Sequence, residues 1–151
     1  MNKVTVRQAV QSDLDAVLTL MEALAEFEGY HHHFKVDRHS LAQLIMDNRH
    51  TGVLVAESSS AVTGILMYFY QPFTYDLKPW LVIKELFVTS HARGQGVGEA
   101  LFNEAKALCK AVGGSKLKWE VLAANHQAKR FYQRQGGRVE DRWQLMTLTL
   151  N

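Results

Sequence analysis

Three glycines and one arginine fall within six residues of this 151-residue chain, between an apolar run and an apolar-periodic stretch. Arg93 begins the pattern R-x-x-G-x-G, and Gly94, Gly96 and Gly98 leave this backbone with few side chains. A strand that leads through glycines into a helix start presents free N–H groups and the positive end of the helix dipole to an anion. The spacing therefore predicts an anion-binding turn.

The two common nucleotide-binding patterns do not fit this turn. The dinucleotide fingerprint requires G-x-G-x-x-G, and neither position 99 nor position 101 is glycine. The P-loop ends in Gly-Lys-Ser or Gly-Lys-Thr, whereas Gly98 is followed by Glu99 and Ala100. A tight strand-to-helix turn, with glycines for packing alone, stays open as the alternative.

The charges are unevenly spread along the chain. The formal net charge is +2, but residues 1–90 carry 7 basic and 10 acidic side chains, and residues 91–142 carry 10 basic and 5 acidic ones. This distribution suits an anionic ligand near the second half and a cationic ligand near the first. Nucleic-acid binding normally shows a dense basic stripe with interleaved aromatic residues, so we expect no nucleic-acid partner.

The composition is typical of one soluble globular domain, residues 1–151. Hydrophobic residues make up 47% and charged residues 21% of the chain. No apolar run approaches the length of a membrane span, and the first ten residues lack the apolar core of a signal peptide. The lone cysteine, Cys109, excludes an internal disulfide and favours a cytoplasmic protein.

Hydrophobic periodicity predicts a mixed α/β domain. Ser12, with Asp15 three residues later, is expected to open the first helix, which runs to about Phe27, and Asp37 to cap the second. An extra short strand near Val139 stays open. The expected strands are residues 3–9, 51–58, 62–70, 80–88, 116–122 and 141–150, and the expected helices are 12–27, 37–45, 97–112 and 125–136.

The glycine turn in its context, after "ELFV" and before "AL", resembles the acyl-CoA pyrophosphate loop of the GCN5-related N-acetyltransferases, the GNAT family. A second stretch, "NHQAKRFYQRQGG", is similar to the family's pattern N-x-x-A-x-x-F-Y-x-x-x-G. The resemblance covers the whole chain and implies the GNAT fold, a mixed central sheet of about six to seven strands flanked by about four helices. Within the family, the chain looks most like the spermidine/spermine and thialysine acetyltransferase branch.

The resemblance implies acetyl-CoA as the acyl donor. In this family the amides of the loop and helix start hold the CoA pyrophosphate, and the pantetheine arm lies along the preceding strand. Asn125 is expected to hydrogen-bond this arm as well as capping its helix. The implied cofactor-binding residues are Leu86, Phe87, Val88, Arg93, Gly94, Gln95, Gly96, Val97, Gly98, Glu99, Asn125, Ala128 and Tyr132.

Acetyl transfer from a thioester to an amine makes three chemical demands. An amine with a pKa near 10.4 is only about a thousandth neutral at neutral pH, so a base, or a water chain leading to one, must take its proton. The carbonyl oxygen gains negative charge and needs N–H donors, for which the resemblance implies the backbone at Leu86–Val88. The leaving thiolate needs a proton, for which the resemblance implies the hydroxyl of Tyr132; a packing role is the alternative.

Acidic residues and one lysine are the candidates for the amine site. Glu85, on the cofactor strand, and Glu28, at the end of the first helix, are the candidate catalytic acids, although each is also compatible with a solvated surface charge. Substrate-binding positions of polyamine-type relatives are matched by Glu28, which has Phe27 beside it, and by Asp141. Those relatives carry a carboxylate where this chain has Lys84, and a cation there repels a polycation. Lys84 therefore favours a lysine-like amino acid as the acceptor.

The expected function is transfer of an acetyl group to a primary amine of a small molecule: a diamine, a polyamine or a lysine-like amino acid. A protein N-terminus or lysine is the first alternative acceptor. A non-catalytic acyl-CoA-binding domain is the second, which Tyr132 and the nearby acids argue against. The resemblance also implies a homodimer. We expect no metal, because consecutive residues such as His31–His33 do not easily converge on one tetrahedral ion.

Overall fold

The computed structural model describes residues 3–151. They cluster in two compact units, Met1–Glu120 and Val121–Asn151, and each unit is described by itself.

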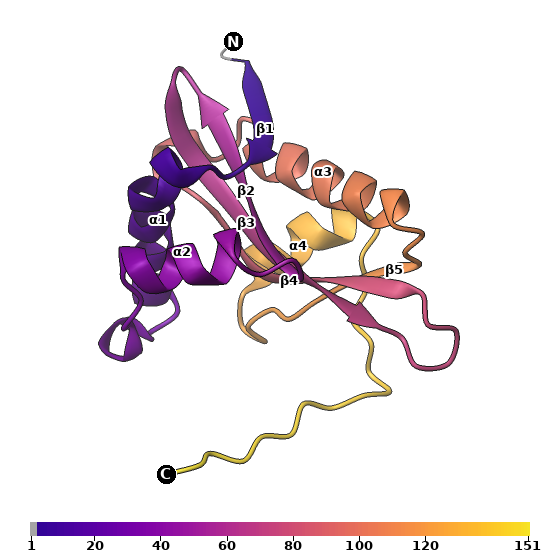
Figure 1. The fold of residues 1–151 in the computed structure, drawn as a ribbon. Coiled ribbons are helices and arrows are strands. Elements are labelled where there is room, and N and C mark those ends of the chain that lie inside the picture. The colour runs from indigo at the N-terminus through magenta and orange to yellow at the C-terminus, as the bar shows by residue number, and fades with distance from the viewer. Residues whose placement is uncertain (1–2) are drawn as a thin grey trace. The chain divides into compact units, whose positions relative to one another are not determined.

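The first unit is built on one mixed sheet of five strands in the order β1-β2-β3-β4-β5 (Figure 1). The first three pairings are antiparallel, and β4 pairs with β5 in parallel. Ser59 and Ser60 form the two-residue turn between β2 and β3, and both have positive φ, as the twist of such a hairpin requires. The strands are β1 (Val4–Gln8), β2 (Thr51–Ser58), β3 (Ala61–Pro72), β4 (Pro79–Val88) and β5 (Lys116–Trp119).

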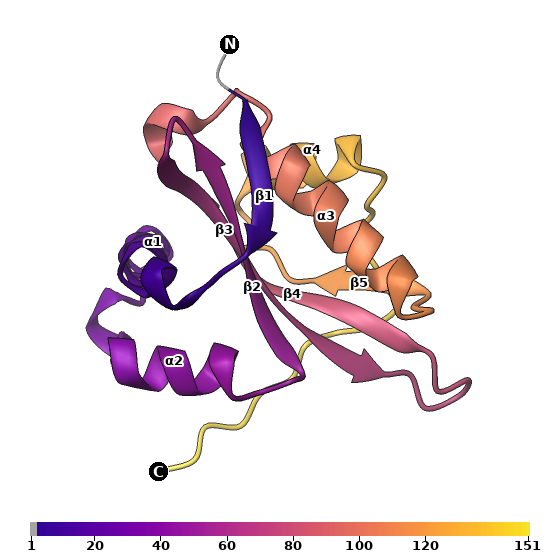
Figure 2. The ribbon, with the colours of Figure 1, turned by 45° about the horizontal axis from the view of Figure 1, so that its top comes forward.

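Helices cover both faces of this sheet. In Figures 1 and 2, α1 (Leu14–Phe27) and α2 (Arg38–Met46) lie on one side of the strands and α3 (Val97–Ala111) on the other. Gly64 lies beneath α3, because a Cβ atom there would clash with Val97 and Leu101. The core on the α1 side is formed by Leu14, Val17, Leu20, Leu41, Val53, Val55, Ile65 and Met67.

The first helix begins later than the sequence pattern predicts. Ser12 does not cap it; Ser12 lies inside a short 3-10 turn, Gln11–Asp13, and α1 starts at Leu14. The carboxylate of Asp13 accepts a hydrogen bond from the backbone N–H of Val10 at 2.8 Å and so closes this turn. The second helix starts as expected: Asp37 accepts a hydrogen bond from the N–H of Ser40 at 2.8 Å.

The second unit contains α4 (His126–Arg134) and no strand. Asn125 caps this helix as expected, accepting a hydrogen bond from the N–H of Ala128 at 3.1 Å. The expected strand at 141–150 and the extra strand near Val139 are not formed, so the prediction of six to seven strands was too high. A strand needs a hydrogen-bonding neighbour, and in the described chain the apolar side chains of Trp143, Leu145, Met146, Leu148 and Leu150 are 71–91% exposed.

Candidate active site

The glycine turn joins the end of β4 to the start of α3 through a 3-10 turn, Ser90–Ala92. Gly94 and Gly96 have φ of 77° and 81°, the left-handed region in which glycine carries no steric penalty. A Cβ atom at either position would meet nothing within 4 Å, so the space in front of the turn is open. These glycines are therefore required by backbone conformation and not by packing against the protein.

The turn leaves backbone donors unused. Gly96 is the N-cap of α3 and has no side chain that could cap it. Among the described residues, the N–H groups of Val97, Gly98 and Glu99 have no acceptor, and the first helical bond runs from the N–H of Ala100 to the carbonyl of Gly96 at 3.0 Å. Unsatisfied first-turn amides together with the helix dipole form an anion-binding site. The donors fit a pyrophosphate such as that of CoA.

Arg93 is fixed at the edge of this turn. Its Nε donates to the carbonyl oxygen of Val88 at 3.0 Å, and its guanidinium lies over the ring of Phe87, 5.5 Å from the ring centroid. The two terminal nitrogens keep their hydrogen-bonding capacity for an anion. Two other predicted residues contribute differently: Gln95 donates its side-chain N–H to the carbonyl of His91 at 3.1 Å, and the side chain of Val97 is buried in the core.

The strands β4 and β5 part just before the turn. Their parallel pairing runs from Trp80 with Lys116 to Ile83 with Trp119 and ends there, whereas β4 stays paired with β3 as far as Val88. The segment 84–88 therefore has one edge without a β5 partner. An exposed strand edge can bind an extended ligand through its amides and carbonyls. The binding of the pantetheine arm along Leu86, Phe87 and Val88, which the resemblance implies, stays a prediction.

A β-bulge interrupts β4 at the start of this open edge. Tyr68 pairs with Ile83 and Met67 pairs with Glu85, so Lys84 is an extra residue without a partner on β3. Bulges re-aim side chains and occur often beside active sites. The bulge therefore places Lys84 and Glu85 at the point where β4 and β5 part.

Glu85 lies on the sheet face that α1 covers. Its pairing partner Met67 belongs to the core on that face, and Phe87, two residues further along β4, packs against the same core. Glu85 is half-buried. The acid is thus held at the margin of the core.

Glu28 is held at the last turn of α1 by a helix-ending motif. Gly29 has φ of 80° and donates its N–H to the carbonyl of Glu26 at 3.2 Å, and the N–H of Tyr30 donates to the carbonyl of Ala25 at 2.7 Å. This paired pattern around a left-handed glycine is the Schellman motif. Phe27 and Tyr30, on either side of Glu28 and Gly29, are 61% and 59% exposed.

Electrostatics connect Glu28, Lys84 and Glu85, three residues from two elements. Desolvation raises the pKa of Glu85 above its usual value, the negative charge of Glu28 raises it further, and the positive charge of Lys84 lowers it. Desolvation also raises the pKa of Glu28, and Lys84 again acts in the opposite direction. Neither side-chain carboxylate accepts a hydrogen bond or forms an ion pair among the described residues. A carboxylate with a raised pKa and no partner is well suited to accept a proton.

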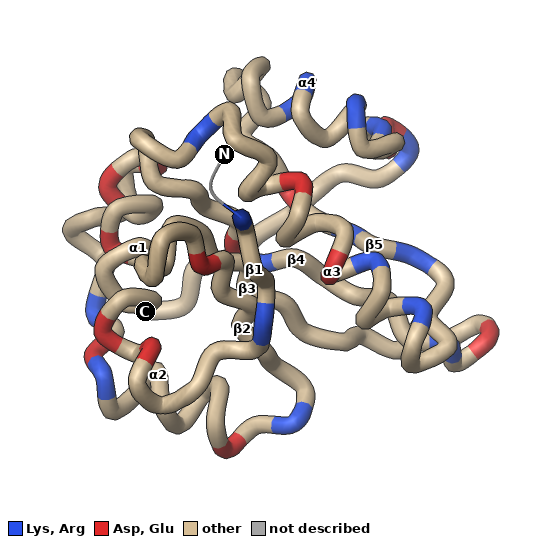
Figure 3. The backbone as a smooth tube through the Cα atoms, turned by 90° about the horizontal axis from the view of Figure 1, so that it is seen from above, with Lys and Arg blue, Asp and Glu red and all other residues tan. Residues whose placement is uncertain are grey.

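The remaining predicted site residues belong to the second unit. On α4, Ala128 is bonded to the Asn125 side chain, and Tyr132 is half-buried, with its ring centroid 5.3 Å from that of Phe131. Asp141 is exposed. Figure 3 shows basic positions along α4. The predicted roles of these residues at the donor and acceptor stay predictions.

Sequence reasoning missed two features of the site. Gly29 and Tyr30 fix the position of Glu28, and a glycine directly after the last apolar-periodic turn is a signal that could have indicated this helix end. Thr89, at the end of β4, has a buried hydroxyl without a hydrogen-bond partner in the described part of the chain. No sequence signal distinguishes that hydroxyl from an ordinary surface threonine.

The described residues contain neither a metal-ligand cluster nor a membrane-spanning helix. No group of three His, Cys, Asp or Glu side chains in residues 3–151 is arranged to hold a metal ion. His31 instead contacts Glu22, with 3.3 Å between Nε2 and Oε1. Within the same residues, every helix is too short or too polar to cross a bilayer.

Comparison with known proteins identifies relatives over most of the chain. The sequence profile of the Acetyltransferase (GNAT) family matches residues 16–137. The chain is similar to thialysine N-epsilon-acetyltransferase of Mus musculus, with 26% identity over 136 residues that cover 84% of this chain and 79% of the relative. It is also similar to the uncharacterized N-acetyltransferase YhfO of Bacillus subtilis (strain 168), with 24% identity over 131 residues and 87% of each chain covered.

Solved structures show the same fold. The crystal structure of an aminoglycoside acetyltransferase from an uncultured soil metagenomic sample, in complex with sisomicin, matches with a TM-score of 0.84 at 18% identity and covers 98% of this chain and 97% of that chain. The predicted α/β GNAT fold is therefore confirmed, with fewer strands than expected. Thialysine acetyltransferases among the relatives support a place near that branch. The chain belongs to the GNAT family and is an acyl-CoA-dependent N-acetyltransferase.

Proposed function

We propose that this protein transfers the acetyl group of acetyl-CoA to a primary amine of a small molecule by direct attack. The acceptor classes that fit are a diamine, a polyamine and a lysine-like amino acid. The similarity to mammalian thialysine N-epsilon-acetyltransferases supports an amino acid with a side-chain amine.

One observation carries the proposal: an open strand edge leads directly into an uncapped helix start. The β5 side of 84–88 is unpaired, the first-turn amides of α3 have no acceptor among the described residues, and the space beside Gly94 and Gly96 is open. An extended arm with a pyrophosphate at one end matches this arrangement. In the proposal, the β4 amides hold the pantetheine arm and stabilise the carbonyl oxygen, and the α3 amides with Arg93 hold the pyrophosphate.

Glu85 is the proposed proton acceptor. The acceptor amine loses its proton to the Glu85 carboxylate, its lone pair forms the new C–N bond, and the bond between the acyl carbon and sulfur breaks. The raised pKa of Glu85 supports this role, because it brings the basicity of the carboxylate closer to that of the group it deprotonates. Glu28, with Phe27 beside it, is proposed to bind the cationic part of the acceptor.

The second unit is proposed to serve the leaving group. The resemblance assigns the Tyr132 hydroxyl to the CoA sulfur, where it donates a proton as the thiolate leaves. The side-chain oxygen of Asn125 is engaged in its helix cap, so its amide nitrogen is the proposed donor to the cofactor arm. Asp141 is proposed as a further acid of the acceptor site.

We also propose a cytoplasmic homodimer that binds neither nucleic acid nor membrane. The exposed apolar side chains of 143–150 support an association between copies, since alternating apolar residues in an extended segment suit strand pairing.

The test is a panel of amines offered with acetyl-CoA, with release of free thiol and product mass as readouts. The panel contains spermidine, thialysine, lysine and a peptide, and calorimetry measures CoA binding separately. Acetylation of a small amine supports the proposal, and acetylation of the peptide alone moves the acceptor to a protein. If the protein acetylates no amine and binds no CoA, the proposal is overturned.

Tyr132→Phe tests the leaving-group role within the same assay. We expect a lower acetylation rate and nearly unchanged CoA affinity. An unchanged rate removes Tyr132 from the reaction.

A further inference from the structure

The bulge in β4 gives the proposed acceptor site a positive charge of its own. Lys84 is the extra residue between Ile83 and Glu85, and it has no pairing partner on β3. Its side chain is exposed. A regular strand would send the side chains of Lys84 and Glu85 to opposite faces, whereas a bulge re-aims one of them.

Lys84 directly precedes Glu85 in the bulge, and in the described chain it forms no ion pair with either Glu85 or Glu28. Its charge acts on both Glu28 and Glu85. Yet no ion pair joins Lys84 to a carboxylate among the described residues, where four of the five ion pairs are 3.3 Å or shorter. The lysine is therefore positioned beside the acids with its hydrogen-bond donors available to a ligand.

The exposed aromatic residues beside Glu28 add an apolar element. Phe27 and Tyr30 flank the last turn of α1, and both rings are largely exposed. Apolar rings suit the methylene spacer of a long amine. The local groups thus offer a proton acceptor, a second carboxylate, one cation and an apolar surface.

We propose that Lys84 pairs with a carboxylate of the acceptor, so that the site prefers an amino acid with a side-chain amine to a diamine or polyamine. This inference rests on the proposed acetyl transfer and narrows its acceptor. Glu28 pairs with the α-ammonium, Lys84 with the α-carboxylate, and Glu85 takes the proton of the attacking side-chain amine. A polyamine has no group for Lys84 and is repelled by it.

Three acceptors that differ by one group each test this assignment. Lysine carries both α-groups, cadaverine lacks the carboxylate, and 6-aminohexanoate lacks the α-amine. We expect the wild-type protein to have a higher kcat/KM for lysine than for cadaverine. We expect Lys84→Gln to reduce the ratio of kcat/KM for lysine to kcat/KM for cadaverine about tenfold, mainly by raising the KM for lysine. A tenfold change corresponds to a loss of about 1.4 kcal/mol of binding free energy.

Two further variants separate the lost charge from a damaged strand. Lys84→Arg keeps the positive charge and is expected to retain the preference for lysine. Lys110→Gln removes one exposed charge from the last turn of α3 and is expected to leave the ratio unchanged. Circular dichroism of each variant checks folding.

Failure of the Lys84 role can be distinguished from failure of the proposed acetyl transfer. An unchanged ratio in Lys84→Gln, or a wild-type preference for cadaverine or spermidine over lysine, overturns the role of Lys84 while acetyl transfer stands. If wild-type protein acetylates no amine and binds no CoA, the proposed function and this inference both fail.

Discussion

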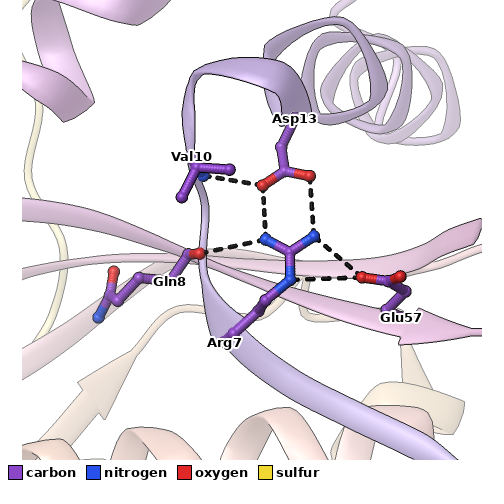
Figure 4. Close-up of polar contacts among 5 residues, drawn as sticks. All are labelled: Arg7, Gln8, Val10, Asp13 and Glu57. Carbon is purple, nitrogen blue, oxygen red and sulfur yellow. Dashed lines mark hydrogen bonds and ion pairs between the residues drawn. The ribbon is translucent and has the colours of Figure 1, made fainter. Parts of the chain in front are cut away.

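Helix α1 has an acid at each end, and the two acids are held in opposite ways. At its start, Asp13 accepts hydrogen bonds from Arg7 Nη1 at 2.7 Å, from Arg7 Nη2 at 3.1 Å and from the N–H of Val10 at 2.8 Å (Figure 4). The same guanidinium reaches Glu57 on β2 at 2.9 Å. At the other end, the carboxylate of Glu28 has no hydrogen bond or ion pair in the described part of the chain.

The pKa values follow from this difference. The hydrogen bond from Arg7 is the main cause that lowers the pKa of Asp13, whereas desolvation raises the pKa values of Glu28 and Glu85. The helix dipole adds to the contrast, because it favours an anion at the N-terminus of α1 and disfavours one at its C-terminus. Asp13 therefore serves stability, whereas the burial of Glu28 and Glu85 costs some stability at neutral pH.

Glu85→Gln gives the largest expected effect on activity. Loss of the proton acceptor should lower kcat/KM by about a hundredfold or more, measured by thiol release. The raised pKa means that the fold disfavours the ionised form at neutral pH, so the neutral glutamine should not lower the free energy of unfolding in urea. If Glu85→Gln is destabilised but fully active, Glu85 has a structural role like that of Asp13 and is not the proton acceptor.

Asp13→Asn should have the opposite profile. We expect it to lower the free energy of unfolding by about 2 kcal/mol, because the charge-assisted hydrogen bonds to Arg7 are weakened, and to leave kcat/KM of the folded protein unchanged. Because the folded-state pKa of Asp13 is lowered, its stabilisation is present at neutral pH and is lost as the pH falls through that pKa. Urea titrations at pH 7 and in acid should therefore show a difference between variant and wild type that shrinks in acid.

Glu28→Gln should have a smaller, selective effect. If Glu28 binds the α-ammonium of the acceptor, kcat/KM should fall about fivefold for lysine and cadaverine, as expected for a partly solvated ion pair of about 1 kcal/mol. The value for 6-aminohexanoate, which has no second amine, should stay near that of the wild type. An equal loss for all three acceptors would assign Glu28 to the chemistry instead of to binding.

The pH dependence of kcat should show the smallest shifts. The base form of Glu85 is lost as the pH falls through its pKa, so kcat has an acid limb there. Glu28→Gln removes a charge that raises this pKa and should move the limb to lower pH, whereas Lys84→Gln should move it to higher pH. Asp13→Asn is the matched control and should leave the limb in place. An acid limb that stays in place in both variants would show that Glu28 and Lys84 are not coupled to Glu85.

The glycine turn and two of the helix caps could be predicted because their signals are local. Gly94 and Gly96 adopt the left-handed conformation that only glycine reaches without strain, and the helix that follows has the apolar spacing expected of it. Asp37 and Asn125 cap their helices through hydrogen bonds that span three residues. Interactions between residues so near in sequence are specified by residue type and spacing.

The arrangement of the proposed acceptor site depends on contacts between residues far apart in sequence. The bulge at Lys84 exists only in the register between β3 and β4, and the open edge exists only because β5 stops pairing at Trp119. The terminal segment has a strand-like pattern, yet the described chain provides it with no hydrogen-bonding neighbour. The sequence by itself determined the family, the glycine turn and the helix caps at Asp37 and Asn125. Only the tertiary structure decided which acids lose water and which find a partner, because desolvation and strand register depend on the elements that surround a residue.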